Sequence, residues 1–470
     1  MLKSVVRYDD VPRSGLSGAA WKALSIIVQF LEKKTGAHML IDEEVVPFGK
    51  TGLADVFEIA EKLRHAGVIQ ALTLGKTLSD EPKLLSWRAT FRDGDENSAG
   101  AGAVSDERHS LIATLAEALE RHIWFERDDY FESPIVSTPA TLKKTHLSPT
   151  QFAGLDIVKR RDALEKKEFL WIRGTSLISN SYVWVPAQTI SAHPRLRARR
   201  QSEPLLRSAV TTGLATHEDQ ARARLGGLLE IIERDAYIIM WLNQLSLPRI
   251  DPETLAAKRH TLRTLLSRCD RYRLTVSFVR MITDAPTYTI CAVVHDGSHM
   301  PPYTVGLKAG QDAAAAAEGA LLEALRARLN ARAQILATSE IVSKQKIRHE
   351  NRLSYWSHLK QSEKLSFLVR GAMGPVMPEV WDTDSPTLHL ERLISWCKQK
   401  SYNCVSVPFT SSNANVPSWH IEMIVVPELQ PLYFDERHPH IFGARISEIP
   451  RAHGHNPRIK PFTEEPHPFV

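Results

Sequence analysis

The spacing of apolar residues along the chain predicts its helices. In residues 53–64, for example, Val56, Phe57, Ala60 and Leu63 recur three or four positions apart, which places them on one face of a helix. The helices predicted in this way, together with one long charged stretch, cover residues 19–31, 53–64, 110–124, 149–167, 223–241 and 313–334.

Short runs of β-branched and aromatic residues predict strands between these helices. The strands cover residues 68–74, two runs within 169–191 joined by a polar turn at Ser179 and Asn180, and residues 275–282, 288–296, 404–410 and 419–431. A strand pair followed by a helix occurs more than once. The sequence therefore predicts an α+β domain with internal pseudo-symmetry, built from repeated strand and helix layers.

The remaining segments carry turn formers, charges or prolines. Residues 93–102 are rich in Gly, Asp and Asn and predict a loop. Residues 339–366 are polar and charged, which predicts a surface insertion. From residue 450 onward prolines are frequent, so the tail is expected to be extended and not helical. Five arginines between Arg195 and Arg207 form a basic loop, which either faces phosphate or an acidic peptide or is simply solvated.

Composition narrows the class of protein. The 470 residues are 43% apolar and 24% charged, as in ordinary globular proteins, and a formal net charge of +5 does not indicate a nucleic-acid partner. The chain has neither a signal-peptide pattern nor an apolar run long enough to cross a membrane. Four cysteines lack the spacing of a zinc site or a disulfide framework, which favours the cytoplasm. We expect a small docking or winged-helix-like module in residues 1–92 and the main domain in residues 93–470.

Two predicted helices carry the same arrangement of two glutamates and an arginine. The first copy consists of Glu117, Glu120 and Arg121, and the second of Glu230, Glu233 and Arg234. Residues three and four positions apart share one helix face, so each copy brings two carboxylates together. Neighbouring carboxylates repel each other unless they are solvated or a cation lies between them, and a divalent cation with phosphates is the usual answer. A solvated, salt-bridged face remains the alternative for either copy alone.

A turn of small residues precedes the second copy. Thr211, Thr212 and Gly213 offer hydroxyl and backbone donors that can approach a phosphate closely. Together with the glutamates, this turn predicts two acidic helices that face one cavity.

With these pieces in place, the chain resembles the YcaO-domain family, and in particular its azoline-forming, ATP-dependent cyclodehydratases of the D-protein type. The resemblance covers roughly residues 100–470. It is carried, in the family's order, by GAGAVSDERHSLIATLAEALERHIW, WIRGTSLISNSYVWVPAQ, TTGLATHEDQARARLGGLLEIIERDAYIIMWLNQLSLPRID, ALLEALRAR and IVVPELQPLYFDERHPHIFGARI. It implies a YcaO-like α+β fold around an ATP cavity.

The resemblance implies ATP and Mg2+ as cofactors. By position in the family's motifs, the expected magnesium ligands are Glu117, Glu120, Glu230, Glu233 and Glu323. The expected ATP-binding set adds Arg121, Thr211, Thr212, Arg234 and Arg326 to these glutamates. The residue types suit the cofactor, because Mg2+ prefers hard oxygen ligands and commonly bridges carboxylates to phosphate.

The resemblance also implies a reaction. In azoline-forming members, a Cys, Ser or Thr side chain of a ribosomally made precursor peptide attacks the preceding backbone carbonyl. ATP phosphorylates the amide oxygen, which then leaves as phosphate while a thiazoline or oxazoline ring forms. Such members commonly end in PxPxP, thought to hold the terminal carboxylate in the active site. Pro466 and Pro468 match two of these prolines and Val470 replaces the last, so we expect all three residues to belong to the catalytic machinery.

Several positions depart from the family's pattern. Ala113 stands where serine is common, Gly319 where arginine is common and Arg326 where glutamine is common, and Thr211-Thr212 replaces Ser-Asn. A nucleotide-binding scaffold without catalysis therefore stays open as an alternative, as does a thioamide- or amidine-forming enzyme.

The partners implied by the resemblance are those of bacteriocin-type peptide biosynthesis. They are a precursor peptide, a leader-binding partner subunit and a flavin-dependent dehydrogenase that oxidises azolines to thiazoles or oxazoles. A homodimer is compatible with the sequence, and neither a membrane nor a nucleic acid is expected as a partner.

Overall fold

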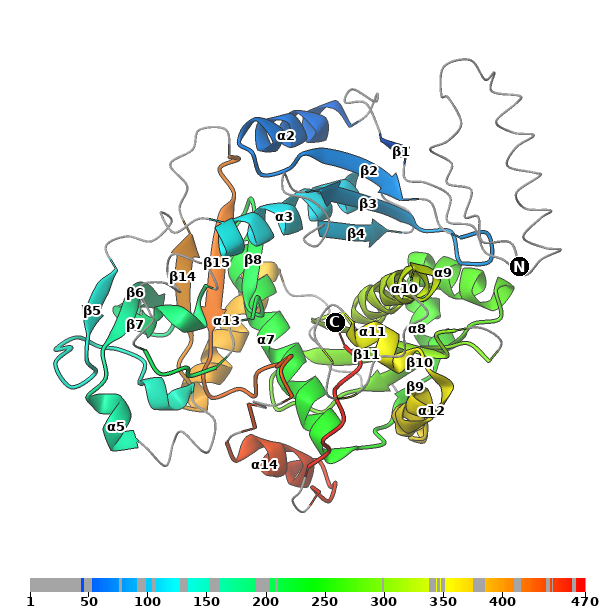
Figure 1. The fold of residues 1–470 in the computed structure, drawn as a ribbon. Helices are drawn as coiled ribbons and strands as arrows, with labels where there is room; N and C mark the ends of the chain where they lie inside the picture. Colours follow the sequence, from blue (N-terminus) through cyan, green and yellow to red (C-terminus); the bar gives the residue numbers. More distant parts are fainter. Residues whose placement is uncertain are drawn as a thin grey trace.

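The computed structural model of the chain describes residues 44–45, 53–75, 78–90, 99–103, 107–126, 134–152, 161–191, 203–207, 210–297, 300–337, 344, 347, 351–374, 385–409, 416–436, 440–441, 443–458 and 462–469. Within these residues, three mainly antiparallel sheets and their helices surround one long helix, α7 (Gln220–Asn243) (Figure 1). The mixture of helices and sheets confirms the predicted α+β class. The helix expected at 19–31 and most of the basic loop before Arg207 lie outside the described residues.

Helix α7 is the centre of the molecule because it contacts two different sheets and is buried throughout its second half. The buried residues 231–243 include the charged Glu233, Arg234 and Asp235 as well as the apolar run 236–242. The Asp219 side chain caps the N-terminus by accepting from the Arg222 N–H at 2.8 Å. At the other end Gln244 adopts a left-handed conformation with φ 53°, which stops the helix.

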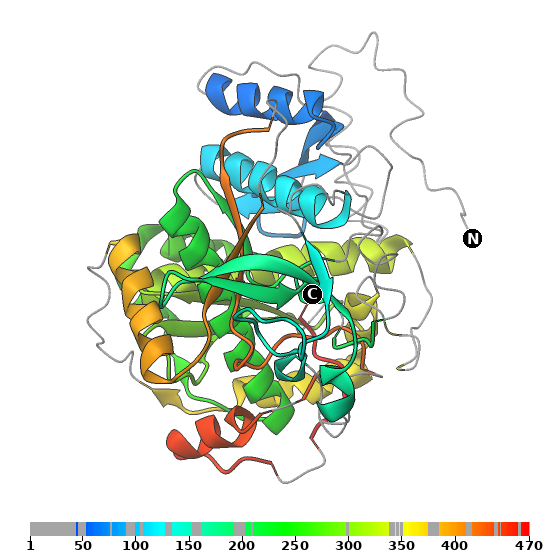
Figure 2. The same cartoon turned by 90° about the vertical axis from the view of Figure 1, so that its left-hand side faces the viewer.

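The first sheet has four strands in the order β1-β2-β3-β4 and lies in the upper part of Figures 1 and 2. Its elements are β1 (Glu44–Val45), β2 (Ala71–Gly75), β3 (Leu85–Thr90) and β4 (Ala99–Ala103), with helices α2 (Ala54–His65) and α3 (Glu107–Glu126) packed against it. The predicted loop at 93–102 is wrong from residue 99 onward, because the Ala-Gly repeat of β4 pairs with β3.

This sheet contains chain from both sides of residue 92. Buried side chains of α2 and β3 share one hydrophobic core with α3 and with strands of the six-stranded sheet described below. The boundary at residue 92 stays a prediction.

The second sheet has six strands in the order β5-β6-β14-β15-β8, with β7 paired to β6. Its strands are β5 (Ile135–Ser137), β6 (Phe169–Ser176), β7 (Tyr182–Pro186), β8 (Leu214–His217), β14 (Val405–Phe409) and β15 (His420–Val425). The strands predicted within 169–191, 404–410 and 419–431 are all present. The continuous helix predicted for 149–167 is not, because a 3-10 turn η2 (Pro149–Gln151) is followed by Phe152 outside the helix and α5 is short (Arg161–Glu165).

The third sheet has the order β12-β11-β10-β9-β13, and only β13 pairs in parallel. Its strands are β9 (Arg249–Ile250), β10 (Thr275–Arg280), β11 (Tyr288–His295), β12 (Tyr303–Gly310) and β13 (Met373–Gly374), and α8 (Pro252–Lys258), α9 (His260–Arg271) and α10 (Ala313–Ala337) share a core with it. Sequence analysis missed β12. Its two glycines and one lysine interrupt the pattern of a strand, and Gly306 is needed because a Cβ there would lie 2.2 Å from the Ala320 carbonyl oxygen.

Two predictions about the second half of the chain are wrong. The expected surface insertion at 339–366 contains α11 (Arg352–Trp356), α12 (Leu359–Ser362) and the start of η5 (Glu363–Val369), and its Trp356 packs edge-on against Trp241 of α7 with ring centroids 5.9 Å apart. The tail is helical until residue 452, because α14 (Arg445–Ala452) accommodates Pro450 near its end, where only one helical hydrogen bond is lost. Helix α13 (Pro386–Gln399), also not predicted, packs on α7.

A buried charge network joins the loop after β2 to α10. The Arg328 Nε donates to both carboxylate oxygens of Glu81 at 2.9 and 3.0 Å, and its Nη2 donates to Asp296 at 2.6 Å. Arg332 donates to Glu81 and to Asp80 at 2.5 and 2.9 Å. These ion pairs fix α10 relative to the first sheet. In the described part of the chain, no helix is both long and apolar enough to cross a membrane.

Candidate active site

Helix α7 holds its two glutamates and its arginine as one buried unit. The Arg234 guanidinium donates to Glu230 at 3.2 Å and forms a second ion pair with Glu233. Glu233 has 5% of its side chain exposed and Glu230 has 29%. Spacing on one helical turn produces this arrangement, as the sequence predicted.

The edge of the five-stranded sheet supplies backbone donors to the acids. Strand β12 is an edge strand, and its Ala309 N–H donates to Glu233 Oε2 at 2.7 Å. Two residues earlier, the Leu307 N–H donates to Glu323 Oε2 of α10 at 2.5 Å. Strand edges carry unpaired N–H groups, and here these groups hold carboxylates from two different helices.

The edge of the six-stranded sheet supplies a backbone donor to Glu230. The Gly213 N–H, just before edge strand β8, donates to Glu230 Oε2 at 2.9 Å. Gly213 has φ +95°, and a Cβ there would lie 2.4 Å from the Ile424 carbonyl oxygen, so only glycine fits this turn. Thr212 is half-buried beside it, whereas Thr211 is exposed.

Helix α3 brings the first pair of glutamates to the same place. Arg121 donates to Glu117 at 2.9 Å, as the spacing predicted. Burial raises the pKa of Glu120 to about 8, and the charges of Glu117 and Glu230 add to this effect more than contact with Thr216 offsets it. Since Glu230 belongs to α7, acids of α3 and α7 lie within reach of each other's charge.

Glu230 of α7 and Glu323 of α10 also carry raised pKa values. For Glu230 the main cause is burial, opposed by Arg234 and by the Gly213 N–H. For Glu323 it is again burial, with Arg234 lowering the pKa and Glu233 raising it. Three helices therefore converge on one cluster of acids that costs free energy when fully ionised, and a cation among them would relieve this cost.

The donor set fits Mg2+ bound together with phosphates. Among the described residues, no group of three or more His, Cys, Asp or Glu side chains is placed to hold a metal ion by itself. Mg2+ does not need such a cage, because it keeps several waters and is usually bound by one or two carboxylates and the phosphates of a nucleotide. Hard carboxylate oxygens with arginines nearby suit this kind of site.

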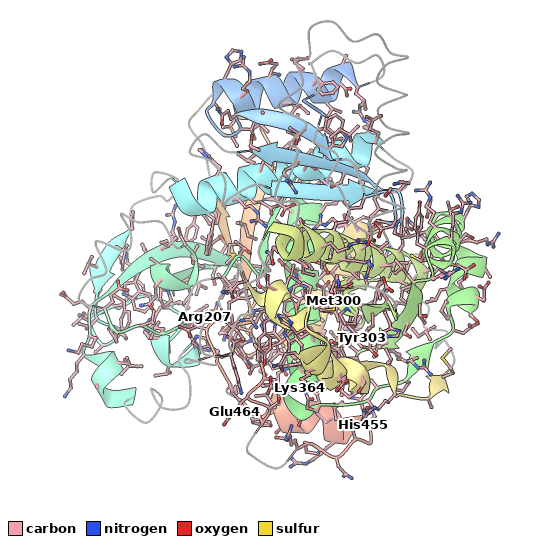
Figure 3. All side chains as sticks on the ribbon, turned by 45° about the vertical axis from the view of Figure 1, so that its right-hand side comes forward. Arg207, Met300, Tyr303, Lys364, His455 and Glu464 are labelled. Carbon is pink, nitrogen blue, oxygen red and sulfur yellow. The ribbon has the colours of Figure 1, made fainter. Side chains whose placement is uncertain are left out.

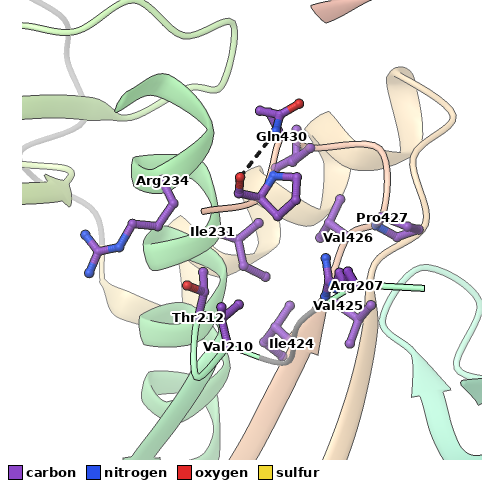
Figure 4. A pocket seen from close by; sticks show the side chains of 12 residues that line it. Arg207, Val210, Thr212, Ile231, Arg234, Ile424, Val425, Val426, Pro427 and Gln430 are labelled. Carbon is purple, nitrogen blue, oxygen red and sulfur yellow. Dashed lines mark hydrogen bonds between the residues drawn. The ribbon is translucent and has the colours of Figure 1, made fainter. Parts of the chain in front are cut away.

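A small pocket with an internal volume of about 20 Å³ adjoins the cluster (Figure 4). Its walls are mostly apolar, and Thr212, Arg234 and Arg207 add polar groups. In Figure 4 the Arg234 guanidinium points away from the other lining side chains. It forms ion pairs with Glu230 and Glu233. Burial lowers the pKa of Arg207 to about 10, and its guanidinium lies over the Phe152 ring at 5.2 Å.

The C-terminal segment runs along α7 and ends at the cluster. Pro466, His467, Pro468 and Phe469 are all buried. The Phe469 ring lies beneath the Arg234 guanidinium, 4.1 Å from its centroid. Figure 1 shows this end of the chain in the middle of the molecule, beside α7 and α11.

Three hydrogen bonds hold this segment in place. Trp241 Nε1 donates to the Glu465 carbonyl oxygen at 3.1 Å, Arg352 Nη1 donates to the His467 carbonyl oxygen at 2.9 Å, and His467 Nε2 lies 2.6 Å from the Tyr433 carbonyl oxygen. Burial lowers the pKa of His467 well below its usual value. Val470 lies outside the described residues, so its role stays a prediction.

The structure shows the contacts made near two of the positions that depart from the family pattern. The Thr114 hydroxyl, next to Ala113, is bound to the Ser110 carbonyl oxygen at 2.9 Å and does not face the cluster. Arg326 lies close enough to Glu323 to lower its pKa. The backbone donors of Leu307 and Ala309 were not identified from the sequence, because a main-chain N–H has no sequence signal of its own. The turn at Gly213 was expected to offer donors to a phosphate, and its N–H donates to Glu230.

A change at Glu120 is expected to reveal its raised pKa. The folded chain releases this proton near pH 8 and an unfolded chain near 4.5, so the folded state binds more protons in between and its stability falls as the pH rises through this range. We expect Glu120→Gln, without nucleotide, to raise Tm at pH 8 by about 2 °C or more, and the difference to shrink toward pH 5. Thermal denaturation at several pH values measures this.

The control for this experiment is Glu391→Gln, since Glu391 is exposed on α13. It should leave Tm unchanged at each pH. A Glu120→Gln variant that is destabilised equally at every pH would show that Glu120 does not carry a raised pKa.

Comparison with known proteins gives one family match. The sequence model of the family described as "YcaO cyclodehydratase, ATP- and Mg2+-binding" matches residues 100–430. A protein of Rhizobium leguminosarum bv. trifolii, described as an uncharacterized protein in the tfuA 3′ region, is 26% identical over 215 residues, which are 45% of this chain and 48% of that protein. The match thus spans about half the length of this relative.

Solved structures share the fold at low sequence identity. A heterocyclase in complex with substrate and cofactor gives a TM-score of 0.70 at 15% identity, over 94% of this chain and 60% of that chain. YcaO from Methanopyrus kandleri bound with AMPPCP and Mg2+ gives 0.58 at 17% identity, over 82% and 92%. The E. coli microcin synthetase McbBCD complex gives 0.58 at 14% identity, over 83% and 91%. At these identities the likeness concerns the fold.

Proposed function

Because the chain belongs to the YcaO family, whose members bind ATP and Mg2+, we propose that it is an ATP-dependent cyclodehydratase that makes azoline rings in a peptide. The family and both cofactors predicted from the sequence are thereby confirmed. The proposed substrate is a ribosomally made precursor peptide, in which Cys, Ser or Thr closes a thiazoline or oxazoline ring. We place this reaction in the cytoplasm, together with a leader-binding subunit and a dehydrogenase.

One observation carries the proposal. Acidic side chains from α3, α7 and α10 converge on one cluster, and the buried C-terminal segment reaches the same cluster through Phe469 and Arg234. Phosphoryl transfer needs charge neutralisation and positioning, and a cluster of this kind provides both.

Each group of residues has a proposed task. ATP supplies the phosphoryl group that turns an amide oxygen into a leaving group. Glu117, Glu120, Glu230, Glu233 and Glu323 would hold Mg2+ and thereby the phosphates. Arg121, Arg234 and Arg326 would balance negative charge, and the Thr211-Thr212 turn would offer donors to a phosphate.

The apolar pocket beside the cluster offers a wall for the reacting part of the peptide. Its internal volume of about 20 Å³ has room for about one water molecule, so the peptide would lie at its mouth. Apolar walls exclude water, which protects an activated amide from hydrolysis. We therefore place the peptide bond that cyclises at the junction of this pocket with Arg234.

The test is direct. The protein is incubated with ATP, Mg2+, a precursor peptide rich in Cys, Ser and Thr and its leader-binding partner, and the peptide is analysed by mass spectrometry. We expect the loss of one water for each ring formed. An unmodified peptide in the presence of the true partner would instead favour a nucleotide-binding scaffold, and incorporation of sulfur from added sulfide would favour thioamide formation.

A further inference from the structure

Lys308 lies on the strand whose backbone holds two acids of the cluster, and no motif in the sequence singles it out. It lies on edge strand β12 between Leu307 and Ala309, the two residues whose N–H groups hold Glu323 and Glu233. Leu307 and Ala309 are buried, while the alternation of side chains along a strand leaves Lys308 exposed. No described carboxylate forms an ion pair with Lys308, so its charge is available to a ligand.

The path of the Lys308 side chain is determined by a glycine on α10. A Cβ added at Gly319 would lie 3.0 Å from Lys308 Cγ and 3.2 Å from Lys308 Cδ. The lysine stem therefore occupies the place that a side chain at position 319 would take. Gly319 is one helical turn before Glu323 on the same face of α10, so the Lys308 stem packs on α10 one turn away from this acid.

The charge of Lys308 also reaches the other side of the cluster. It lowers the pKa of Glu230 on α7, although burial keeps that pKa raised overall. The lysine charge thus lies within electrostatic reach of Glu230 while its stem packs on α10.

We propose that Lys308 is a phosphate-binding residue of the ATP site and supplies from β12 the positive charge that α10 lacks at Gly319. This inference rests on the ATP site proposed above and adds a residue to it. An ammonium group is a common phosphate ligand, and its flexible stem allows it to reach a phosphate from a neighbouring element. Arginine is common in the family at the position where this chain has Gly319, and a cation on the adjacent strand would preserve that charge.

The proposal is tested by removing the positive charge at position 308 and restoring it at position 319. Binding of AMPPCP with Mg2+ is measured by calorimetry for the wild type, Lys308→Ala, Lys308→Arg and the double variant Lys308→Ala/Gly319→Arg. We expect Lys308→Ala to raise Kd about tenfold or more, since it removes a charged hydrogen bond to phosphate. Lys308→Arg keeps the charge and should stay close to wild type. The double variant should recover most of the affinity, because removal of the lysine stem frees space for the arginine.

The controls separate this inference from the proposed function. Lys398→Ala removes an exposed lysine of α13 and should leave Kd unchanged. Thermal denaturation shows whether each variant is folded. A wild-type Kd for Lys308→Ala overturns the inference, and so does a double variant that binds as weakly as Lys308→Ala. A wild type that binds no AMPPCP contradicts the ATP site itself.

Discussion

Glu230→Gln is expected to lower the rate of ATP turnover roughly 1,000-fold, while the protein stays folded. Glutamine has the same shape and still accepts the hydrogen bond that Gly213 donates to Glu230 at 2.9 Å. It carries no negative charge, so it is a poor ligand for Mg2+. Burial raises the pKa of Glu230, and a neutral side chain at this position therefore suits the ligand-free fold. The measurement is phosphate release from ATP in the presence of Mg2+, peptide and partner.

The matched control is again Glu391→Gln, an identical chemical change on the exposed face of α13. It should leave turnover unchanged. Thermal denaturation of Glu230→Gln should give a Tm at or above that of the wild type. Full turnover in a folded Glu230→Gln protein would remove Glu230 from the metal shell.

The acidic helix was predictable from the sequence because its geometry is local. The positions of Glu230, Glu233 and Arg234 determine their mutual contacts as soon as the segment is a helix, and the surrounding apolar run predicts that helix. The same argument covers Glu117 and Arg121 on α3. Neither argument needs the rest of the fold.

The contacts between these helices were not predictable in the same way. Glu233 is held by Ala309 and Glu323 by Leu307, through backbone groups at the edge of a strand that was itself missed. Which N–H groups are left at an edge depends on the order of strands in the sheet, which is a property of the whole fold.

Burial of polar segments was misjudged for a related reason. Residues 351–369 look polar in sequence, yet Trp356 and Leu365 are buried against partners from other parts of the chain. Arg352 is buried as well, since it donates to the carbonyl oxygens of His467 and Phe434. A few large apolar side chains and one well-bonded arginine outweigh the polar average of the segment.

The C-terminal segment is anchored to the rest of the chain upstream of the point where it reaches the acidic cluster. Tyr355 and Lys364 bind the Glu465 carboxylate at 2.9 and 3.0 Å, and these contacts lie upstream of Phe469. Figure 3 labels Lys364 and Glu464, the residue before Glu465, in the lower part of the view. Because these contacts do not involve Phe469, a change there should release only the last residues.

Phe469→Ala is therefore expected to lower peptide cyclodehydration about 100-fold, the scale of loss when a reacting group is slightly misplaced. The ring covers the Arg234 guanidinium at 4.1 Å and packs against the Tyr237 ring with centroids 5.8 Å apart. Without it, Arg234 gains water and the segment end loses its anchor, while the acids proposed to hold Mg2+ remain. Ring formation is followed by mass spectrometry, and AMPPCP binding by calorimetry should change less than about threefold.

The control for this change lies five residues earlier. Glu464 has 84% of its side chain exposed, so Glu464→Ala should form rings at the wild-type rate. Proteolysis of the folded protein adds a second readout, since cleavage after residue 462 should become faster in Phe469→Ala and not in Glu464→Ala. Wild-type ring formation by a Phe469→Ala protein with a released end would separate the segment from the chemistry. Loss of AMPPCP binding in the same variant would mean that the segment supports the nucleotide site, because Arg234 would then need Phe469 to stay paired with Glu230 and Glu233.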